Sequence, residues 1–92
     1  MKIEFRFHAL QRMFERKISA AEVLETVATG KIIEEYPNDQ PYPSCLRLAF
    51  IKGRPLHVVT AEATKEKITI IITAYVPSTE QWESGFEKRK QK

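Results

Sequence analysis

The chain has few of the residues from which most chemical sites are built. Its 92 residues include one cysteine, two histidines and three glycines that stand apart from one another. A single cysteine excludes an intrachain disulfide, and separated glycines exclude a glycine-rich phosphate loop. No histidine or cysteine has the spacing of a zinc-ligand pair, so we expect neither a metal nor another cofactor.

Long apolar runs and a strong charge of one sign are also absent. No run approaches the roughly 20 apolar residues that cross a membrane, and the first residues do not resemble a signal peptide, so we expect a cytoplasmic protein. The net charge is +3, of which residues 83–92 contribute +2. We therefore expect one domain over residues 1–82, close to neutral, followed by a basic C-terminal tail over 83–92. Dedicated nucleic-acid binders are usually more basic.

Hydrophobic periodicity predicts the elements of an α+β domain. Apolar and polar residues alternate at the N-terminus, as in a short strand or extended arm, and residues 8–17 then change to helical spacing. Ser19 and Glu22 form a capping-box pattern at the start of a second helix, which should end at Gly30. Strands are expected at about 31–35, 45–51, 56–62 and 67–76, and Ser78 could cap a last helix. The predicted fold has two N-terminal helices packed on one face of an antiparallel β-sheet of about four strands.

Packing and register follow from which face of the sheet is the more apolar. The residues expected between the helices and the sheet are Leu10, Phe14, Val23, Leu24, Val27, Leu48, Val58, Ile70 and Ile72. A three-residue hairpin loop ending at Gly53 would place Arg47 opposite His57. A two-residue loop would instead place Leu48 opposite His57 and move Arg47 to the other face. We prefer the first register because it keeps Leu48 on the same face as the isoleucines.

In the preferred register, Arg47, His57 and Tyr75 share the sheet face that points away from the helices. Cleavage of RNA without a metal needs a base for the 2′-hydroxyl, an acid for the leaving oxygen and a cation for the charged phosphorane. His57 could act as acid or base, Arg47 could hold the phosphate, and Tyr75 could stack on a base or donate a proton.

The predicted first helix carries the other candidate residues. His8, Arg12 and Arg16 lie largely off its apolar stripe and could bind an RNA substrate or a partner protein. Each candidate also has a structural alternative. His8 could orient its own helix, the two arginines could form surface ion pairs, and His57 could be a half-buried strand residue bonded to Tyr75.

Several phrases of the chain resemble one known family. They are His8-Ala9-Leu10-Gln11-Arg12-Met13-Phe14-Glu15-Arg16, Ile18-Ser19-Ala20-Ala21-Glu22-Val23, Gly30-Lys31-Ile32-Ile33-Glu34-Glu35-Tyr36-Pro37, Tyr42-Pro43-Ser44-Cys45-Leu46 and Pro55-Leu56-His57-Val58-Val59. In this order, between about residue 8 and Trp82, they are similar to the prokaryotic family called domain of unknown function 4258.

The resemblance implies a relationship to RelE-type and BrnT-type toxins, and therefore a RelE-like fold. It also implies a toxin of a type II toxin–antitoxin pair. The cognate partner would be an antitoxin with a zinc finger and a helix-turn-helix, and the target would be RNA, free or on the ribosome. The family brings no established catalytic set, so the link to ribonucleases is analogy at the level of the fold.

Two functions therefore stay open at this stage. The first is a toxin with metal-free endoribonuclease activity, and the alternative is a non-catalytic protein-interaction module. The position of His57 relative to Arg47 separates them. Convergence of the two side chains in an open groove favours the enzyme, whereas burial or divergence favours the interaction module.

Overall fold

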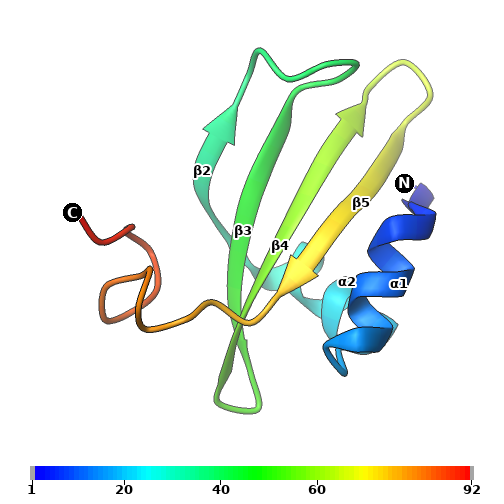
Figure 1. Ribbon diagram of the computed structural model, residues 1–92. Helices are drawn as coiled ribbons and strands as arrows, with labels where there is room; N and C mark the ends of the chain where they lie inside the picture. The colour runs from blue at the N-terminus through cyan, green and yellow to red at the C-terminus, as the bar shows by residue number, and fades with distance from the viewer. Residues whose placement is uncertain (1, 92) are drawn as a thin grey trace.

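The computed structural model describes residues 2–91 as two helices and a five-stranded sheet (Figure 1). The elements in chain order are β1 (Lys2–Phe5), α1 (Phe7–Glu15), α2 (Ala20–Thr29), β2 (Lys31–Tyr36), β3 (Ser44–Ile51), β4 (Arg54–Ala63) and β5 (Ile68–Tyr75). The predicted α+β class, both N-terminal helices and the four later strands are confirmed. None of the helices among these residues is long and apolar enough to cross a membrane.

Helix α2 begins and ends where its sequence predicts. The Ser19 hydroxyl accepts a hydrogen bond from the Glu22 amide at 3.1 Å, and the Glu22 carboxylate accepts one from the Ser19 amide at 2.8 Å. This capping box satisfies two amides that the helix itself leaves free. At the other end, a Cβ on Gly30 would lie 2.4 Å from the Thr26 carbonyl oxygen, so only glycine fits there.

The sheet has more strands than predicted, and its pairing is mixed. The strand order is β1-β5-β4-β3-β2, with β1 parallel to β5 and every other pair antiparallel. The prediction of about four antiparallel strands was wrong because β1 pairs in parallel with β5, the last strand in chain order. Phe5 lies beside Ile71 in this pair. Alternation within four residues shows that a strand can form, but it does not identify a partner more than sixty residues away.

The preferred hairpin register was also wrong. Ile51 pairs with Arg54, so the loop holds only Lys52 and Gly53, with φ values of 54° and 80°. Two consecutive left-handed residues form the turn that best fits a twisted two-residue hairpin. His57 consequently lies opposite Leu48, and Arg47 lies opposite Val58. Lys52 adopts the left-handed conformation in this turn, although residues other than glycine seldom do so.

A bulge in β5 decides which isoleucines face the helices. Val59 pairs with Thr73 but Thr60 pairs with Ile71, so Ile72 has no partner and the alternation of β5 shifts by one residue. Ile71 therefore joins the core beneath the helices, while Ile70 lies on the other face. The core beneath the helices consists of Ala9, Met13, Ile18, Val23, Ile51, Leu56, Val58, Ile71 and Ala74.

Several residues expected between the helices and the sheet lie elsewhere. Val23 and Val58 are buried there as predicted, and Val27 packs at the margin. Leu48 and Ile70 are buried on the opposite face. Leu10, Phe14, Leu24 and Ile72 are exposed. Helix α1 instead packs on the sheet through Ala9 and Met13, because a small residue at the contact lets the helix approach closely.

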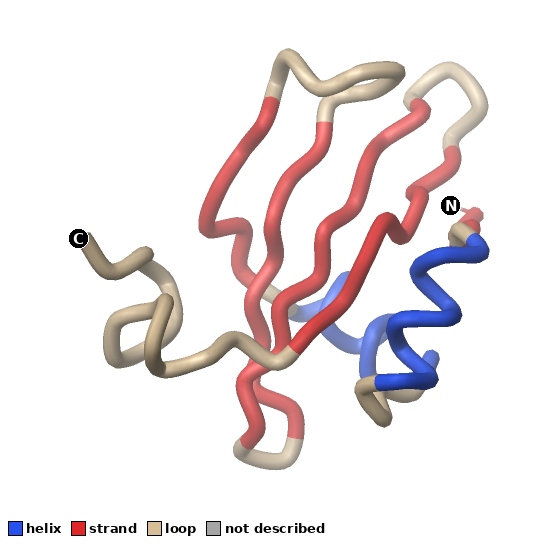
Figure 2. Tube along the Cα trace, viewed as in Figure 1, coloured by secondary structure: helices blue, strands red, loops and turns tan. Residues whose placement is uncertain are grey.

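Residues 76–91 form no helix, so the last helix that Ser78 was expected to cap is absent from them. The Trp82 amide donates to the Ser78 carbonyl at 3.1 Å, which closes a single turn. Gly85 and Phe86 then take φ values of 89° and 61°, which end any helix and reverse the chain. Residues 82–89 fold back against the sheet on the side opposite the helices, and we call them the C-terminal cover (Figures 1 and 2).

These positions predict opposite outcomes for two truncations. Ile71→Ala removes a fully buried side chain and should lower the free energy of unfolding by about 2–5 kcal/mol. Phe14→Ala removes a side chain that is 86% exposed and should change it by less than about 0.5 kcal/mol. Urea denaturation of both variants measures the difference. Equal destabilisation by the two changes would show that α1 packs on the sheet through the other side of the helix.

Candidate functional site

His57 lies at the centre of the sheet face that the C-terminal cover occupies. It is fully buried and pairs across the strands with Tyr75. Its Nε2 lies 2.9 Å from the Phe86 carbonyl oxygen, and its Nδ1 lies 3.3 Å from the Tyr75 hydroxyl. A carbonyl only accepts, so Nε2 carries the proton and Nδ1 accepts from Tyr75. Both ring nitrogens of a neutral His57 are therefore satisfied.

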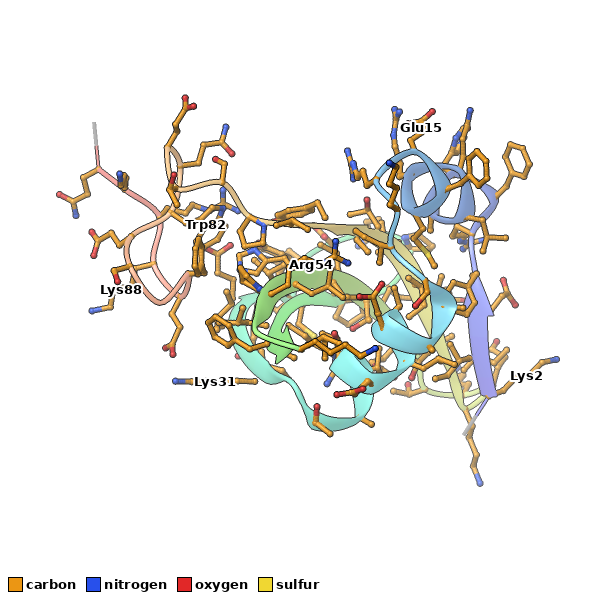
Figure 3. All side chains as sticks on the ribbon, turned by 90° about the horizontal axis from the view of Figure 1, so that it is seen from below. Lys2, Glu15, Lys31, Arg54, Trp82 and Lys88 are labelled. Atoms are coloured by element: carbon orange, nitrogen blue, oxygen red, sulfur yellow. The ribbon has the colours of Figure 1, made fainter. Side chains whose placement is uncertain are left out.

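Trp82 closes this site from outside. Its ring is 2% exposed and stands edge-on to the His57 ring, with the two centroids 4.5 Å apart. The Arg89 guanidinium lies over the outer side of Trp82, 4.6 Å from the ring centroid. Figure 3 shows Trp82 on the side of the molecule away from Glu15 of α1. The cover therefore contributes a core residue of its own.

An ion pair fixes the cover to β2. Arg89 donates two hydrogen bonds to the Glu34 carboxylate, at 3.0 and 3.1 Å, and the Tyr36 hydroxyl donates to the same carboxylate. Lys31 and Glu87 form a second contact between β2 and the cover at 2.8 Å. We call His57, Tyr75, Glu34 and Arg89 the His57 cluster. It combines an imidazole, a phenol, a carboxylate and a guanidinium from three strands and the C-terminal cover.

The surroundings of the cluster shift the proton affinities of its members. Burial lowers the pKa of His57, although the Phe86 carbonyl and the Glu34 charge oppose this effect. Burial also raises the pKa of the Tyr75 hydroxyl. Burial disfavours ionisation of Glu34, but the hydrogen bonds from Arg89 and Tyr36 outweigh it and lower the pKa of that carboxyl. At neutral pH the cluster therefore pairs a neutral imidazole with a carboxylate and a guanidinium.

Arg47 does not belong to this cluster. It lies on the helix-bearing face of the sheet, where its Nε donates to the Thr60 hydroxyl at 3.1 Å. Its Nη2 lies 3.5 Å from Glu62, whose other oxygen accepts from Thr69 at 2.9 Å. The expected convergence of Arg47 and His57 was wrong, because the two-residue hairpin places them on opposite faces. The proximity of His57 and Tyr75 is as expected.

The candidates His8 and Arg12 on α1, and Arg16 directly after it, lie apart from the cluster. His8 is exposed, with its ring edge-on to Phe7. Arg12 pairs with Glu15 at 3.1 Å on the surface, and Arg16 donates to the Ala74 carbonyl at 2.9 Å. Arg16 thus ties the end of α1 to the end of β5, while Arg12 and His8 face solvent.

The His57 cluster contains the groups that metal-free phosphodiester cleavage requires, but in this conformation its imidazole is buried, whereas the Arg89 side chain is 57% exposed. The hollow of about 370 Å³ beside the cover is lined by Glu80, Gln81, Arg89, Lys90 and Gln91, and not by His57. Within residues 2–91, no three His, Cys, Asp or Glu side chains are arranged to hold a metal ion.

Sequence reasoning missed Glu34, Arg89 and Trp82 as members of this site. Arg89 lies in a stretch that we expected to be a basic tail, and its pairing with Glu34 spans 55 residues. One signal was present in the sequence. The only tryptophan of the chain comes shortly after the last strand, where a large apolar ring needs a surface to cover.

Comparison with known proteins identifies the family. The family model "Domain of unknown function (DUF4258)" matches residues 5–76, so the chain belongs to this family, as the resemblance of its phrases indicated. The matched range includes both helices, strands β2 to β5 and only Phe5 of β1. No curated protein and no solved structure matches the chain.

The lowered pKa of His57 predicts how stability depends on pH. Below the ordinary value of 6.5, the unfolded chain binds a proton that the folded chain resists. The free energy of unfolding should therefore decrease as the pH falls from about 7 to about 5.5, by at most about 1.4 kcal/mol per pH unit, and stay level above about 7.5. Urea denaturation at several pH values measures this dependence.

His57→Gln is the matched variant for this measurement, since it removes the titrating group and retains a side-chain amide donor. The variant should be less stable than wild type at about pH 8 but should lack the slope between about pH 7 and 5.5. An identical slope in both proteins would assign the pH dependence to other groups.

Proposed function

We propose that this member of the DUF4258 family acts by binding a protein partner, and that the exposed apolar face of α1 is the binding surface. The observation that carries the proposal is the exposure of Phe7, Leu10 and Phe14, at 76%, 47% and 86% respectively. We call these three residues the α1 stripe. Adjacent large apolar side chains on the surface of a small domain mark an interaction site.

The spacing of the stripe supports a protein as the ligand. Phe7, Leu10 and Phe14 stand at positions i, i+3 and i+7, so they lie on one side of the helix. The same spacing anchors amphipathic helices in their partners. Ala9 and Met13, which are packed on the sheet, lie about 100° further round the helix. The apolar face of α1 is therefore wide, and the sheet covers only one part of it.

The state of the candidate catalytic residues supports binding over catalysis. His57 is buried under the cover, and Arg47 lies on the other face of the sheet. Burial of His57 and its separation from Arg47 are the features expected of an interaction module, and both support this function.

The family resemblance extends the proposal to a biological setting. In it, the chain is the toxin-like member of a type II toxin–antitoxin pair in the cytoplasm, with a RelE-like fold. Its partner is an antitoxin encoded beside it, with a zinc finger and a helix-turn-helix. The order of the elements, two helices followed by an antiparallel run of strands, is consistent with that fold.

Co-expression with the encoded neighbour tests this proposal. We expect the two chains to elute together from a size-exclusion column at micromolar concentration, and Phe14→Ser to weaken the complex at least about tenfold. Ile32→Ser is the matched control, since Ile32 is a 45% exposed apolar residue of β2, at the sheet edge opposite β1. Separate elution of the two wild-type chains, or equal weakening by both variants, would contradict the proposal.

A second candidate function rests on the His57 cluster. Metal-free cleavage of RNA would use neutral His57 to take the 2′-hydroxyl proton, Arg89 to stabilise the charged phosphorane and the Tyr75 hydroxyl to protonate the leaving 5′-oxygen. For this, the cover would have to leave the sheet while Arg89 stayed close to the phosphate. The contacts of the cover with the rest of the chain include the ion pairs of Arg89 and Lys31 and the packing of Trp82 on His57.

Cleavage of total cellular RNA in the presence of a chelator tests this second function. His57→Gln should lower the rate by about a hundredfold or more, whereas Arg47→Ala, a change on the opposite face, should leave it nearly unchanged. Circular dichroism must show that both variants are folded. No cleavage by the wild-type chain, with or without ribosomes, would eliminate this candidate and leave the interaction module.

A further inference from the structure

Two segments carry an excess of positive charge, the segment around α1 and residues 83–92. Residues 6–17 hold four Lys/Arg and one Glu, a balance of +3. The rest of the chain has eleven basic and eleven acidic residues, which cancel. Residues 83–92 carry +2, which the other residues outside α1 offset, so a local excess of +3 surrounds the exposed stripe of Phe7, Leu10 and Phe14.

The cations stand at both ends of this stripe. Arg6 directly precedes α1, and Arg16 and Lys17 directly follow it. The Arg6 guanidinium lies as far as 3.9 Å from the Glu4 carboxylate, and both side chains are about half exposed. Arg16 donates to the neutral carbonyl of Ala74, which leaves its charge uncompensated at that contact. The α1 surface thus combines an apolar centre with positive charge at either end.

This combination points to the chemistry of the partner. Interfaces match charges of opposite sign around an apolar core, which steers the encounter and excludes wrong partners. Helix α1 is nine residues long, about 13 Å, so a partner helix of three turns spans the stripe and reaches the cations at both ends.

On these grounds we infer that the α1 stripe binds an amphipathic helix of a partner protein whose apolar residues are flanked by Asp and Glu. The inference rests on the proposed function and specifies the partner for the same surface. A second copy of this chain is disfavoured as the occupant, because a symmetric contact through α1 would place a charge of +3 against +3.

Selection from a peptide library tests the inference directly. The library consists of helical 16-residue peptides with leucine at positions i, i+3 and i+7 and with random residues at the flanking positions. Peptides are selected on the wild-type chain and depleted on the Phe7→Ser/Phe14→Ser variant. Both substituted side chains are exposed, so the variant should fold as the wild type does. We expect Asp and Glu to be enriched at the flanking positions.

Affinities measured by fluorescence anisotropy then separate charge from apolar contact. For a selected peptide, Arg6→Glu/Lys17→Glu should raise the Kd about tenfold or more, and the effect should shrink in high salt. Ile32→Ser should leave the Kd unchanged. The same peptide with Lys in place of its Asp and Glu residues should bind at least about tenfold more weakly.

Each remaining outcome is decisive. Selected peptides with neutral or basic flanks would overturn the acidic partner but keep protein binding at α1. Binding of a single-stranded RNA or of phosphatidylglycerol vesicles that depends on Phe7 and Phe14, without enriched peptides, would assign the stripe to that ligand and overturn the inference. A dimer in sedimentation that Phe14→Ser dissociates would assign the stripe to a second copy. If no peptide is enriched, and Phe14→Ser does not weaken the complex with the encoded neighbour, the proposed function is overturned as well.

Discussion

A sheet that is apolar on both faces has to be covered on both, and this constraint shapes the molecule. The two helices cover one face with Ala9, Met13 and Val23. The other face carries Leu46, Leu48 and His57, all of them buried. Residues 2–91 include no third helix for that face, and the C-terminal cover lays Trp82 against it instead. The burial of His57 and its resistance to protonation follow from this covering, because a neutral imidazole tolerates an apolar contact that a charged one does not.

Local sequence signals predicted the elements well, and the pairing between them only in part. The capping box at Ser19 and the alternation in the later strands each depend on a few neighbouring residues, which the sequence displays directly. The hairpin register depended on whether Lys52 adopts a left-handed conformation, and the β5 bulge shifts the alternation at Ile72. A shift of one residue reverses which face a side chain occupies. The misplacement of Arg47 and Ile70 has this cause.

The candidate site shows the same limit at longer range. The expected sharing of one face by His57 and Tyr75 is observed, but it depends on the bulge at Ile72, because regular alternation from the Glu62–Thr69 pair would place Tyr75 on the helix side. Glu34 and Arg89 could not be placed, because their contact depends on how an irregular segment folds across the sheet. The exposed stripe on α1 was missed for a related reason. Leu10 and Phe14 have the spacing of a core stripe, and so do Ala9 and Met13, and only the tertiary contact shows which pair the sheet covers.

The parallel pairing of β1 with β5 has a consequence for how the chain is made. Strand β1 and helix α1 both pack on β5, so during synthesis they leave a ribosome before the strand that completes their packing. Contacts this far apart in sequence slow folding, because a long loop must close before they form. Until then Ala9 and Met13 stay in water beside Phe7 and Phe14. The nascent chain therefore presents a segment with a wide apolar face, which is the kind of surface that a chaperone recognises.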